Sequence, residues 1–437
     1  MRTIEDYIIP GQTYTNLQEV IISRKELRAL SFFWGGFVLY TAAFALYFTA
    51  NGKGLYRVEA IGLLVMLFSA MGAVQVKIEN NYLKAIYVLY CGWLLTVIAR
   101  GFSFNYDFLY NSFFDAWYGI LPYFVPIVLL FPKNVFYLKK VFTAISVLGV
   151  VFIIYSVMFR GQLGDLDNNV KSQDLMEIFS KTLAVPCGFL VITYVYHSKK
   201  RKLLAFSVIA LCLLLALIRA RRAISFMNIT YLVCFYLMYL YANRIRFSTF
   251  LFSIFVIALI AFGGFQIYTA NKHGAFNLIT NRIDEDTRTT VEECFYDDLT
   301  TKEWIVGKGM RGTYFCPQVD ESSDDYTGGY RTMIETDYLN IILKGGVISI
   351  GLLLLIALPA VFNGLFRSKN MLSKGCAIWI LLWLIDLYPA TVNTFTLNYL
   401  LVWISIGICY SKTIRYMAEK DVKELLTEKS KTFTLAK

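Results

Sequence analysis

Residues 345–365 read GGVISIGLLLLIALPAVFNGL and contain no charged side chain. A bilayer core about 30 Å thick is crossed by roughly 20 apolar residues in an α-helix, so this stretch predicts a membrane-spanning helix. Eleven further stretches have the same apolar character. In chain order the twelve lie at about 29–49, 59–76, 84–99, 117–131, 138–158, 177–196, 203–218, 223–241, 247–268, 345–365, 375–387 and 396–411. Because helices satisfy their own backbone polar groups, the sequence predicts an all-α polytopic membrane protein with about 12 transmembrane helices.

The composition of the whole chain agrees with this class. Of the 437 residues, 57% are hydrophobic and 17% are charged, whereas soluble globular proteins average about 45–50% apolar and about 25% charged residues. The mean hydropathy of +0.54 points the same way. These values exclude a water-soluble enzyme of two or three domains. Two stretches fit a spanning helix least well, because 117–131 contains Pro122 and Pro126 and 375–387 is short.

The basic residues predict how the chain is threaded through the membrane. Lys and Arg in short loops mark the cytoplasmic side, and every even-numbered turn carries them. In chain order they are Lys77, Lys133, Lys139, Lys140, Lys199, Lys200, Arg201, Lys202, Arg244, Arg246, Arg367, Lys369 and Lys374. Both termini are therefore expected in the cytoplasm, as tails 1–28 and 412–437, and the first crossing is expected to be an uncleaved anchor. The net charge of +11 then reflects topology and not nucleic-acid binding.

One basic cluster opposes this topology. Arg219, Arg221 and Arg222 lie in a short turn between the stretches 203–218 and 223–241, which the threading puts on the outer side. These side chains could reach the outer lipid headgroups. Alternatively they form an anion site, since the planar guanidinium binds phosphate through two parallel hydrogen bonds. An anionic lipid pyrophosphate would match the position of the second alternative.

Residues 269–344 form the one long polar segment, and the threading puts it outside, in the periplasm. Apolar side chains recur there at helical spacing and predict an amphipathic helix over 288–300 with Thr287 as N-cap. They are Val291, Cys294, Phe295 and Leu299. Residues 307–312 (GKGMRG) read as a turn, and they lack the strand, spacing and helix of a nucleotide-binding loop.

The end of this loop and its two cysteines supply further candidates. Ile334, Tyr338, Ile341 and Ile342 share a helical face, with Glu335 on another, before Gly345-Gly346 opens the next spanning helix. Glu335 could face a substrate cavity or be a solvated interfacial acid. An oxidising exterior permits a disulfide between Cys294 and Cys316. His273 is the outer imidazole, either solvated or a base. No cysteine–histidine set has the spacing of a zinc site.

Several of these motifs, in this order, resemble the O-antigen polymerase and O-antigen ligase superfamily (the Wzy and WaaL proteins). Residues 218–223 resemble its arginine and small residue at the outer start of a helix. Arg288, Trp304 and Gly307-Lys308-Gly309 resemble the Arg…Trp…Gly-x-Gly pattern of its large periplasmic loop. Residues 334–346 resemble the segment after that loop, where ligases carry a histidine at the position of Glu335. The likeness covers about 200–410, and the missing histidine favours a polymerase over a ligase.

The resemblance implies a GT-C-like membrane glycosyltransferase that needs no metal or other cofactor. Its donor would be a glycan on undecaprenyl pyrophosphate, and its acceptor a second lipid-linked repeat unit, at the outer face of the bacterial inner membrane. The product would be O-antigen, capsule or exopolysaccharide, and a chain-length regulator protein is a possible partner. Arg222, Arg288 and Glu335 would be the catalytic residues. Contacts to the substrate would come from Arg219, Arg221, His273, Arg311 and Tyr338.

Individual roles follow from the same resemblance. Arg222 would contact the pyrophosphate with support from Arg219, and Arg288 would hold the second phosphate or the proximal sugar, unless it only pairs with Glu292 on its own helix. Glu335 would act as base or bind a sugar hydroxyl. Tyr338 would stack on sugar or pack at the interface. Two other functions compete, a ligase that transfers the glycan to a lipid A-core acceptor and a lipid-linked oligosaccharide flippase or transporter. The long outer loop counts against the flippase and transporter.

Overall fold

A computed structural model describes residues 24–47, 54–75, 78–132, 135–165, 169–243, 288–317 and 328–427, with a few isolated positions between 262 and 270. Most of the predicted helix 247–268, and also Thr287 and His273, lie outside the described residues. The α-helices are α1 (Arg24–Tyr47), α2 (Leu55–Ala73), α3 (Asn81–Ala99), α4 (Tyr106–Phe114), α5 (Val135–Met158), α6 (Arg160–Leu163), α7 (Asn169–Phe179), α8 (Cys187–Ile192), α9 (Lys199–Ile218), α10 (Arg222–Asn243), α13 (Thr289–Asp298), α14 (Thr301–Val306), α15 (Asp337–Phe366), α16 (Met371–Asp386), α17 (Leu397–Tyr410), α18 (Lys412–Tyr416) and α19 (Glu419–Thr427). The remaining elements are the 3₁₀-helices η3 (Leu121–Leu130) and η5 (Tyr194–Tyr196), the π-helix η4 (Ser180–Ala184) and the strands β1 (Tyr314–Phe315) and β2 (Tyr330–Arg331).

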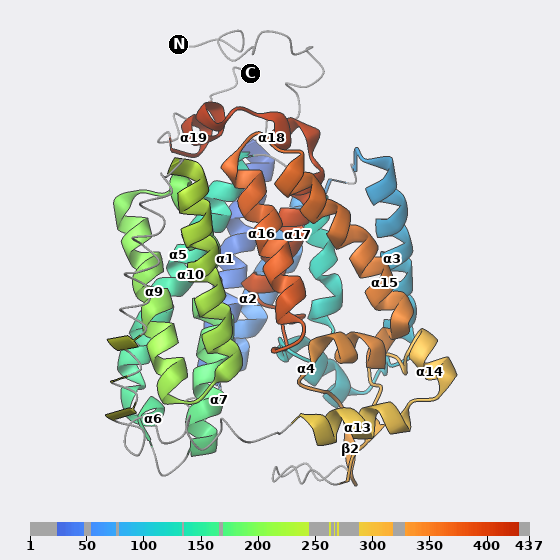
Figure 1. The fold of residues 1–437 in the computed structure, drawn as a ribbon. Coiled ribbons are helices and arrows are strands. Elements are labelled where there is room, and N and C mark those ends of the chain that lie inside the picture. The colour runs from blue at the N-terminus through green and yellow to red at the C-terminus, as the bar shows by residue number, and fades with distance from the viewer. Residues whose placement is uncertain are drawn as a thin grey trace.

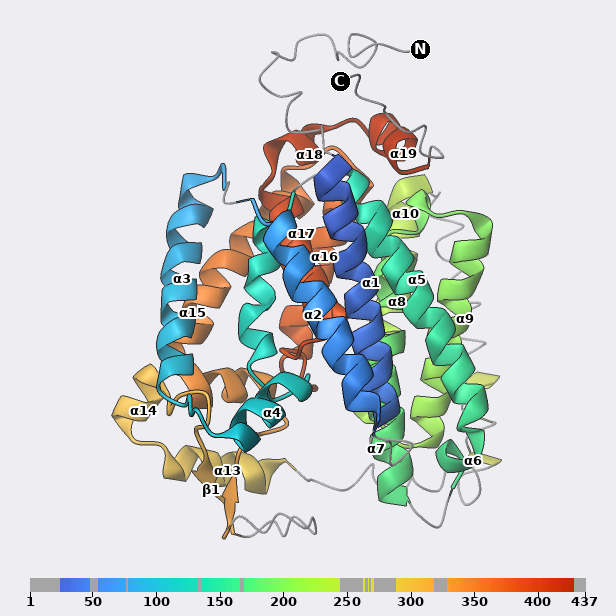
Figure 2. The ribbon, with the colours of Figure 1, turned by 180° about the vertical axis from the view of Figure 1, so that it is seen from behind.

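The long helices form one bundle (Figures 1 and 2). Among the described residues, seven helices are long and apolar enough to cross a membrane: α1, α2, α3, α5, α9, α10 and α15. Their apolar side chains can face lipid, while each helix satisfies its backbone polar groups within itself. The chain is therefore an all-α membrane protein, as predicted. The number of twelve crossings stays a prediction.

The predicted crossings that differ from regular long helices do so for local reasons. The stretch 117–131 becomes the 3₁₀-helix η3, which contains Pro122 and Pro126. Proline has no N–H to donate and clashes with the preceding turn of an α-helix. The stretch 177–196 is divided among α7, η4, α8 and η5, with Pro186 directly before α8. These two segments are therefore irregular helices and not single regular α-helices.

Helix α17 is the centre of the bundle. All of its residues are buried, and Trp403 on this helix and Trp379 on α16 are among the largest fully buried side chains. Tyr90 stacks on Trp403 with ring centroids 5.7 Å apart, and Tyr231 stacks on Trp379 at 5.2 Å. Aromatic packing of this kind adds about 0.5–1.5 kcal/mol per pair beyond area burial. The aromatic residues therefore hold helices from both halves of the chain together.

Different segments of the chain lie at the two ends of the bundle. We call the end with α13, α14, β1 and β2 the loop end, and the end with α18 and α19 the tail end (Figures 1 and 2). Tyr196 Oη donates to Glu419 Oε2 at 3.0 Å, and Lys369 N donates to Arg415 O at 2.8 Å. The basic segments 199–202 and 367–374 therefore lie at the tail end. The turn after α9 lies at the loop end, as the alternation of basic turns predicted, and the assignment of the tail end to the cytoplasm stays a prediction.

The described residues of the long polar segment, 288–317 and 328–344, pack together on the loop end, and we keep the name outer loop for this segment. Its helix α13 packs through a small core whose members are Val291, Phe295, Leu299, Tyr314, Cys316, Ile334, Leu339, Ile342 and Leu343. The predicted amphipathic helix is thus present and begins at Thr289. The expected N-cap, Thr287, is wrong, because Arg288 occupies that position and makes no side-chain cap bond. Its apolar face is covered by the hairpin of β1 and β2 and by the start of α15.

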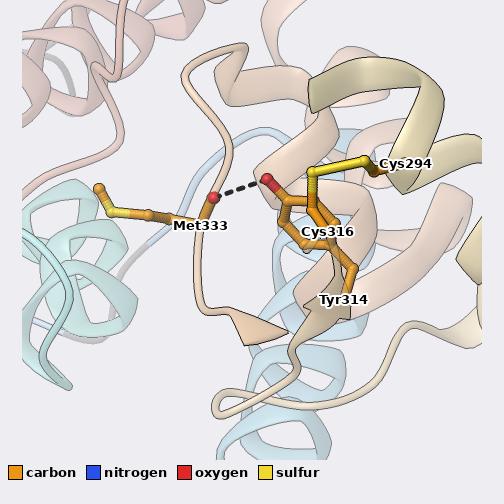
Figure 3. Close-up of a disulfide and its surroundings, with 4 residues drawn as sticks. All are labelled: Cys294, Tyr314, Cys316 and Met333. Atoms are coloured by element: carbon orange, nitrogen blue, oxygen red, sulfur yellow. Dashed lines mark hydrogen bonds between the residues drawn. A yellow bond between two sulfur atoms is a disulfide. The ribbon is translucent and has the colours of Figure 1, made fainter. Parts of the chain in front are cut away.

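A disulfide joins α13 to the hairpin. Cys294 is bonded to Cys316, with their Cα atoms 5.2 Å apart, and this is the pairing expected from the sequence. Tyr314 Oη donates to Met333 O at 3.0 Å from the same side, while the Met333 side chain points away from the disulfide (Figure 3). The disulfide and this hydrogen bond fix the strand that leads to Glu335.

The glycine turn 307–312 docks on the start of α15. Lys308 N donates to Leu343 O at 2.7 Å, and Gly309 N donates to Lys344 O at 2.9 Å. The two carbonyl groups of α15 thus accept hydrogen bonds from the backbone of the loop. The Gly-x-Gly motif, which was not expected to bind a nucleotide, therefore attaches the outer loop to the bundle.

A kink at Gly346 makes this docking possible. Gly346 has φ 68° and ψ −178°, so the helix bends where the pair Gly345-Gly346 was expected to open it. Gly307 has φ 70° and its Cα faces the backbone of Gly345. Arg100, at the end of α3, clamps the same junction by donating to Gly307 O at 2.8 Å and Val306 O at 2.7 Å.

Candidate functional site

A cavity of about 750 Å³, which we call the first cavity, lies at the loop end of the bundle. Arg221, Arg222, Arg288 and Glu335 all line it. The first two come from the turn between α9 and α10, and the other two come from opposite ends of the outer loop. The tertiary fold therefore brings together four residues that the sequence had nominated from three separate segments.

Ten of the 25 described residues that line the first cavity are charged. They are Glu59, Asp115, Asp174, Glu177, Lys181, Arg221, Arg222, Arg288, Arg331 and Glu335. Five are basic and five are acidic, so the wall is polar without a large net charge. Such a wall can hold arginines in fixed directions before any ligand arrives.

The arginine turn is tight and left-handed at its centre. Ala220 has φ 54°, a conformation that is uncommon for residues other than glycine. Arg221 N still donates to Ala216 O at 2.9 Å, and α10 begins at Arg222, directly after the turn. Backbone strain of this kind is found at functional sites more often than elsewhere. Beyond the turn, Arg219 contacts Asp165 while Arg221 contacts α7.

Arg221 is held by two carboxylates. Its Nη2 lies 2.7 Å from Asp174 Oδ1, its Nη1 lies 3.0 Å from Glu177 Oε2, and its Nε donates to Gln173 O at 3.1 Å. Burial raises the pKa of Asp174, and the charge of Arg221 opposes that rise. Lys181 forms a further ion pair with Glu177. The guanidinium of Arg221 is therefore fixed in place at the cavity wall.

Arg219 lies apart from this group. It is 2% exposed, caps the end of α9, and donates from Nη1 to Asp165 O at 3.3 Å. It does not appear among the described residues that line the first cavity. Its observed contacts stabilise the turn that carries Arg221 and Arg222, so any effect of Arg219 on the site is indirect.

Arg288 and Glu335 form an ion pair across the outer loop. Arg288 Nε lies 3.4 Å from Glu335 Oε2, and the side chain of Glu335 is 61% exposed. Arg288 also donates to Pro389 O at 2.7 Å and Tyr388 O at 3.3 Å. Arg288 is thereby tied to the segment between α16 and α17, and its predicted intrahelical alternative, Glu292, instead accepts a hydrogen bond from Thr336.

Six charged lining residues were missed by the reasoning from sequence: Glu59, Asp115, Asp174, Glu177, Lys181 and Arg331. Glu59, Glu177 and Lys181 lie within predicted crossings, where a charge was treated as part of an apolar stretch, and Arg331 lies on β2. Lys181 is also placed over the ring of Trp117, with Nζ 5.1 Å from the ring centroid. Charged residues within apolar segments are rare and commonly functional. That rule was the available signal for Lys181 and Glu59.

A second cavity, of about 490 Å³, adjoins the first. Six residues line both cavities: Asn111, Asp115, Trp117, Tyr118, Met333 and Thr391. Arg311 lines the second cavity and not the first, with its guanidinium 4.7 Å from the ring centroid of Phe108. Arg311 is therefore separated from the other nominated arginines.

The remaining nominated residues are placed as follows. Tyr338 packs, partly buried, against the core of the bundle and that of the outer loop, and it is among the lining residues of neither cavity. His273 lies outside the described residues. Within the described part of the chain, no group of three or more His, Cys, Asp or Glu side chains is arranged to hold a metal ion.

The chemistry available in the first cavity is electrostatic. Guanidinium groups bind phosphate oxygens through paired, charge-assisted hydrogen bonds, and carboxylates that fix the arginines avoid reorganisation when a ligand enters. The wall thus suits an anion that carries several oxygens.

Comparison of the chain with family models, with characterised proteins and with solved structures gives no match.

Proposed function

We propose that this protein is a membrane glycosyltransferase that polymerises oligosaccharide repeat units carried on undecaprenyl pyrophosphate. The single observation that carries the proposal is that Arg221, Arg222, Arg288 and Glu335 line one cavity at the loop end. Arg222 and Arg288 resemble positions of the O-antigen polymerase and ligase pattern, and Glu335 occupies the position where ligases carry a histidine. The pattern alone did not require the three to be close. The reaction would take place at the periplasmic face of the bacterial inner membrane.

The proposed reaction requires little from the protein beyond positioning and charge. A hydroxyl of the acceptor sugar attacks the anomeric carbon of the donor glycan, and polyprenyl pyrophosphate leaves with its electron pair. Arg222 and Arg288 would stabilise the negative charge that develops on the pyrophosphate, supported by Arg221 with its two carboxylate partners. Loss of one such donor typically costs about 2.7–4 kcal/mol, or roughly 100- to 1,000-fold in rate.

In this proposal Glu335 orients Arg288 and is not the general base. Because it is 61% exposed and pairs with Arg288, its observed contact supports orientation of that arginine. Ligases of the resembled superfamily carry a histidine at this position, and this chain does not. A ligase that transfers the glycan to a lipid A-core acceptor remains the second candidate on that resemblance, and no observation favours it over the polymerase.

The test is reconstitution with a defined substrate. Purified protein in lipid vesicles is given a synthetic repeat unit on polyprenyl pyrophosphate, and the products are separated by length. A polymerase yields a ladder of oligomers, whereas a ligase yields product only when a lipid A-core acceptor is added. A flippase yields no new glycosidic bond in either mixture. If correctly folded protein forms no glycosidic product in any of these mixtures, the proposal is refuted.

The role of the arginines has its own test in the same assay. Arg222→Ala and Arg288→Ala are each expected to lower turnover roughly 100-fold or more. Lys420→Ala is a suitable control, because that lysine is on α19 at the tail end (Figure 1) and lines neither cavity. Full chain length from Arg222→Ala at normal protein level would remove Arg222 from the catalytic group.

A further inference from the structure

The second cavity is unused by the chemistry above. Its volume of about 490 Å³ lies in the range of small-molecule sites, about 300–1,000 Å³. Of its 28 described lining residues four are charged, against ten of 25 in the first cavity. Its wall is made mainly of amide, hydroxyl and aromatic groups such as Asn111, Ser112, Tyr123, Thr313 and Tyr399. These groups suit an uncharged ligand rich in hydroxyls, since amides both donate and accept and aromatic rings offer apolar faces.

Most charges in the second cavity are engaged by the fold. Lys344 Nζ donates to Gly312 O at 2.8 Å and to Thr332 O at 2.7 Å. Asp337 Oδ2 accepts from two backbone N–H groups of the segment that joins α16 to α17, at 2.8 and 2.7 Å. Arg311 stacks on an aromatic ring. Three of the four charged groups are therefore committed to contacts within the protein.

Asp115 stands where the two cavities meet. It is the one carboxylate among the six described residues that line both. Its Oδ1 accepts from Trp117 N at 2.8 Å and Tyr118 N at 3.0 Å, which fixes the carboxylate while using one of its two oxygens. Burial raises the pKa of Asp115, and those two N–H groups oppose the rise. A carboxylate in this state accepts a proton more readily than an ordinary aspartate.

We propose that the second cavity binds the sugars of the acceptor, and that Asp115 is the general base for the attacking hydroxyl. This inference rests on the proposed function and names the acceptor site and the base. In the step, the acceptor oxygen forms a bond to the anomeric carbon of the donor in the first cavity. The bond from that carbon to the phosphate oxygen breaks, its electron pair leaves with the pyrophosphate, and the hydroxyl proton passes to the Asp115 carboxylate. Water then takes the proton.

The other carboxylates of the first cavity are less suited to this role. Glu335 is paired with Arg288, and Asp174 and Glu177 are paired with Arg221. Glu59 is 2% exposed on α2 and lines the first cavity only. Asp115 alone among them, in the described part of the chain, reaches both cavities.

The decisive variant is Asp115→Asn. Asparagine keeps an Oδ1 that can accept from the two backbone N–H groups, so the turn is preserved, and it removes the proton acceptor. Because general-base catalysis contributes about 10²–10⁴-fold, the turnover number is expected to fall at least 100-fold. The melting temperature and the affinity for polyprenyl pyrophosphate are expected to match those of the wild type.

A second variant tests the acceptor cavity. Thr313→Trp fills part of the second cavity, which Thr313 lines while lying outside the first. It is expected to raise KM for the acceptor at least 10-fold without changing donor binding. Thr301→Trp is the matched control, because Thr301 is exposed on α14 and lines neither cavity.

The outcomes separate the two proposals. If the wild-type protein forms no glycosidic bond, the proposed function fails. If the wild type polymerises and folded Asp115→Asn keeps more than half of its turnover, Asp115 is not the base. If Thr313→Trp leaves the acceptor KM at the wild-type value, the second cavity is not the acceptor site.

Discussion

The junction at Gly346 allows a quantitative prediction for Gly346→Ala. The added Cβ would lie 2.0 Å from Ile305 O, where real Cβ contacts stay beyond 3.0 Å, so the loop backbone must retreat by about 1 Å. The alanine would also occupy φ 68° and ψ −178°, a region almost restricted to glycine that costs about 1–3 kcal/mol. The retreat weakens the two bonds that Lys308 N and Gly309 N donate to α15, each with a net contribution of about 0.5–1.5 kcal/mol.

The sum is about 2–6 kcal/mol of lost stability at the junction. Since 1.4 kcal/mol corresponds to a factor of ten, the lower bound predicts about 30-fold more frequent opening of the outer loop. Amide hydrogen exchange of the peptide that contains Lys308 and Gly309 measures this directly in detergent-purified protein. Turnover is expected to fall as well, because the loop carries Arg288 and Glu335.

Gly351→Ala is the matched control for this prediction. Gly351 also lies in α15, and a Cβ there would meet nothing within 4 Å. Alanine has the better helix propensity by about 0.5–1 kcal/mol, so exchange at the junction is expected to stay as in the wild type. Unchanged protection of Lys308 and Gly309 in Gly346→Ala would refute the steric reasoning.

Three further predictions concern the same end of the molecule. Asp337→Ala leaves two buried N–H groups without their acceptor, at about 1–3 kcal/mol each, so the melting temperature should fall, and a value equal to that of Asp337→Asn would count against this reading. Alkylated protein should show a mass shift on reduction, and Cys294→Ser should cost about 3 kcal/mol of loop stability, measured as protease resistance; no mass shift would remove the disulfide. The N–H of Thr300 holds the pKa of Glu303 below its ordinary value, so the capping contribution is complete above the unfolded pKa and is lost as the pH falls through the folded pKa. The protection factors of the α14 amides, which are corrected for the intrinsic pH dependence of exchange, should therefore fall on acidification and be independent of pH in Glu303→Gln.

Reasoning from sequence located the bundle and the segments of the site. The apolar runs predicted α2, α3, α9, α10 and α15, because a residue pattern that suits lipid is local and needs no tertiary information. The spacing of Val291, Phe295 and Leu299 likewise predicted α13, and an oxidising exterior allowed its disulfide. The irregular η3 and the divided segment α7–η4–α8 were predicted as simple crossings, since hydropathy reports burial in lipid and does not report helix regularity.

The site was only half predictable. Arg222 and Arg288 were nominated because basic residues opposed the threading rule or matched a family pattern, and both signals are visible in a linear chain. Lys181 and Glu59 were overlooked inside apolar stretches, and their importance depends on which face of a helix turns toward the cavity. Asp115 lies between two predicted crossings, and it was overlooked because nothing in its neighbourhood shows that it would stand between two cavities.

The sequence by itself determined that the chain is a membrane protein, which turns are basic and which segment forms the long polar loop. These properties follow from short runs of residues and their interaction with lipid or water. The tertiary structure decided that Arg219 supports the turn, that Glu335 pairs with Arg288, and that Arg311 lines a different cavity from Arg222. These outcomes depend on helix rotation and on contacts between distant segments, which no local pattern encodes.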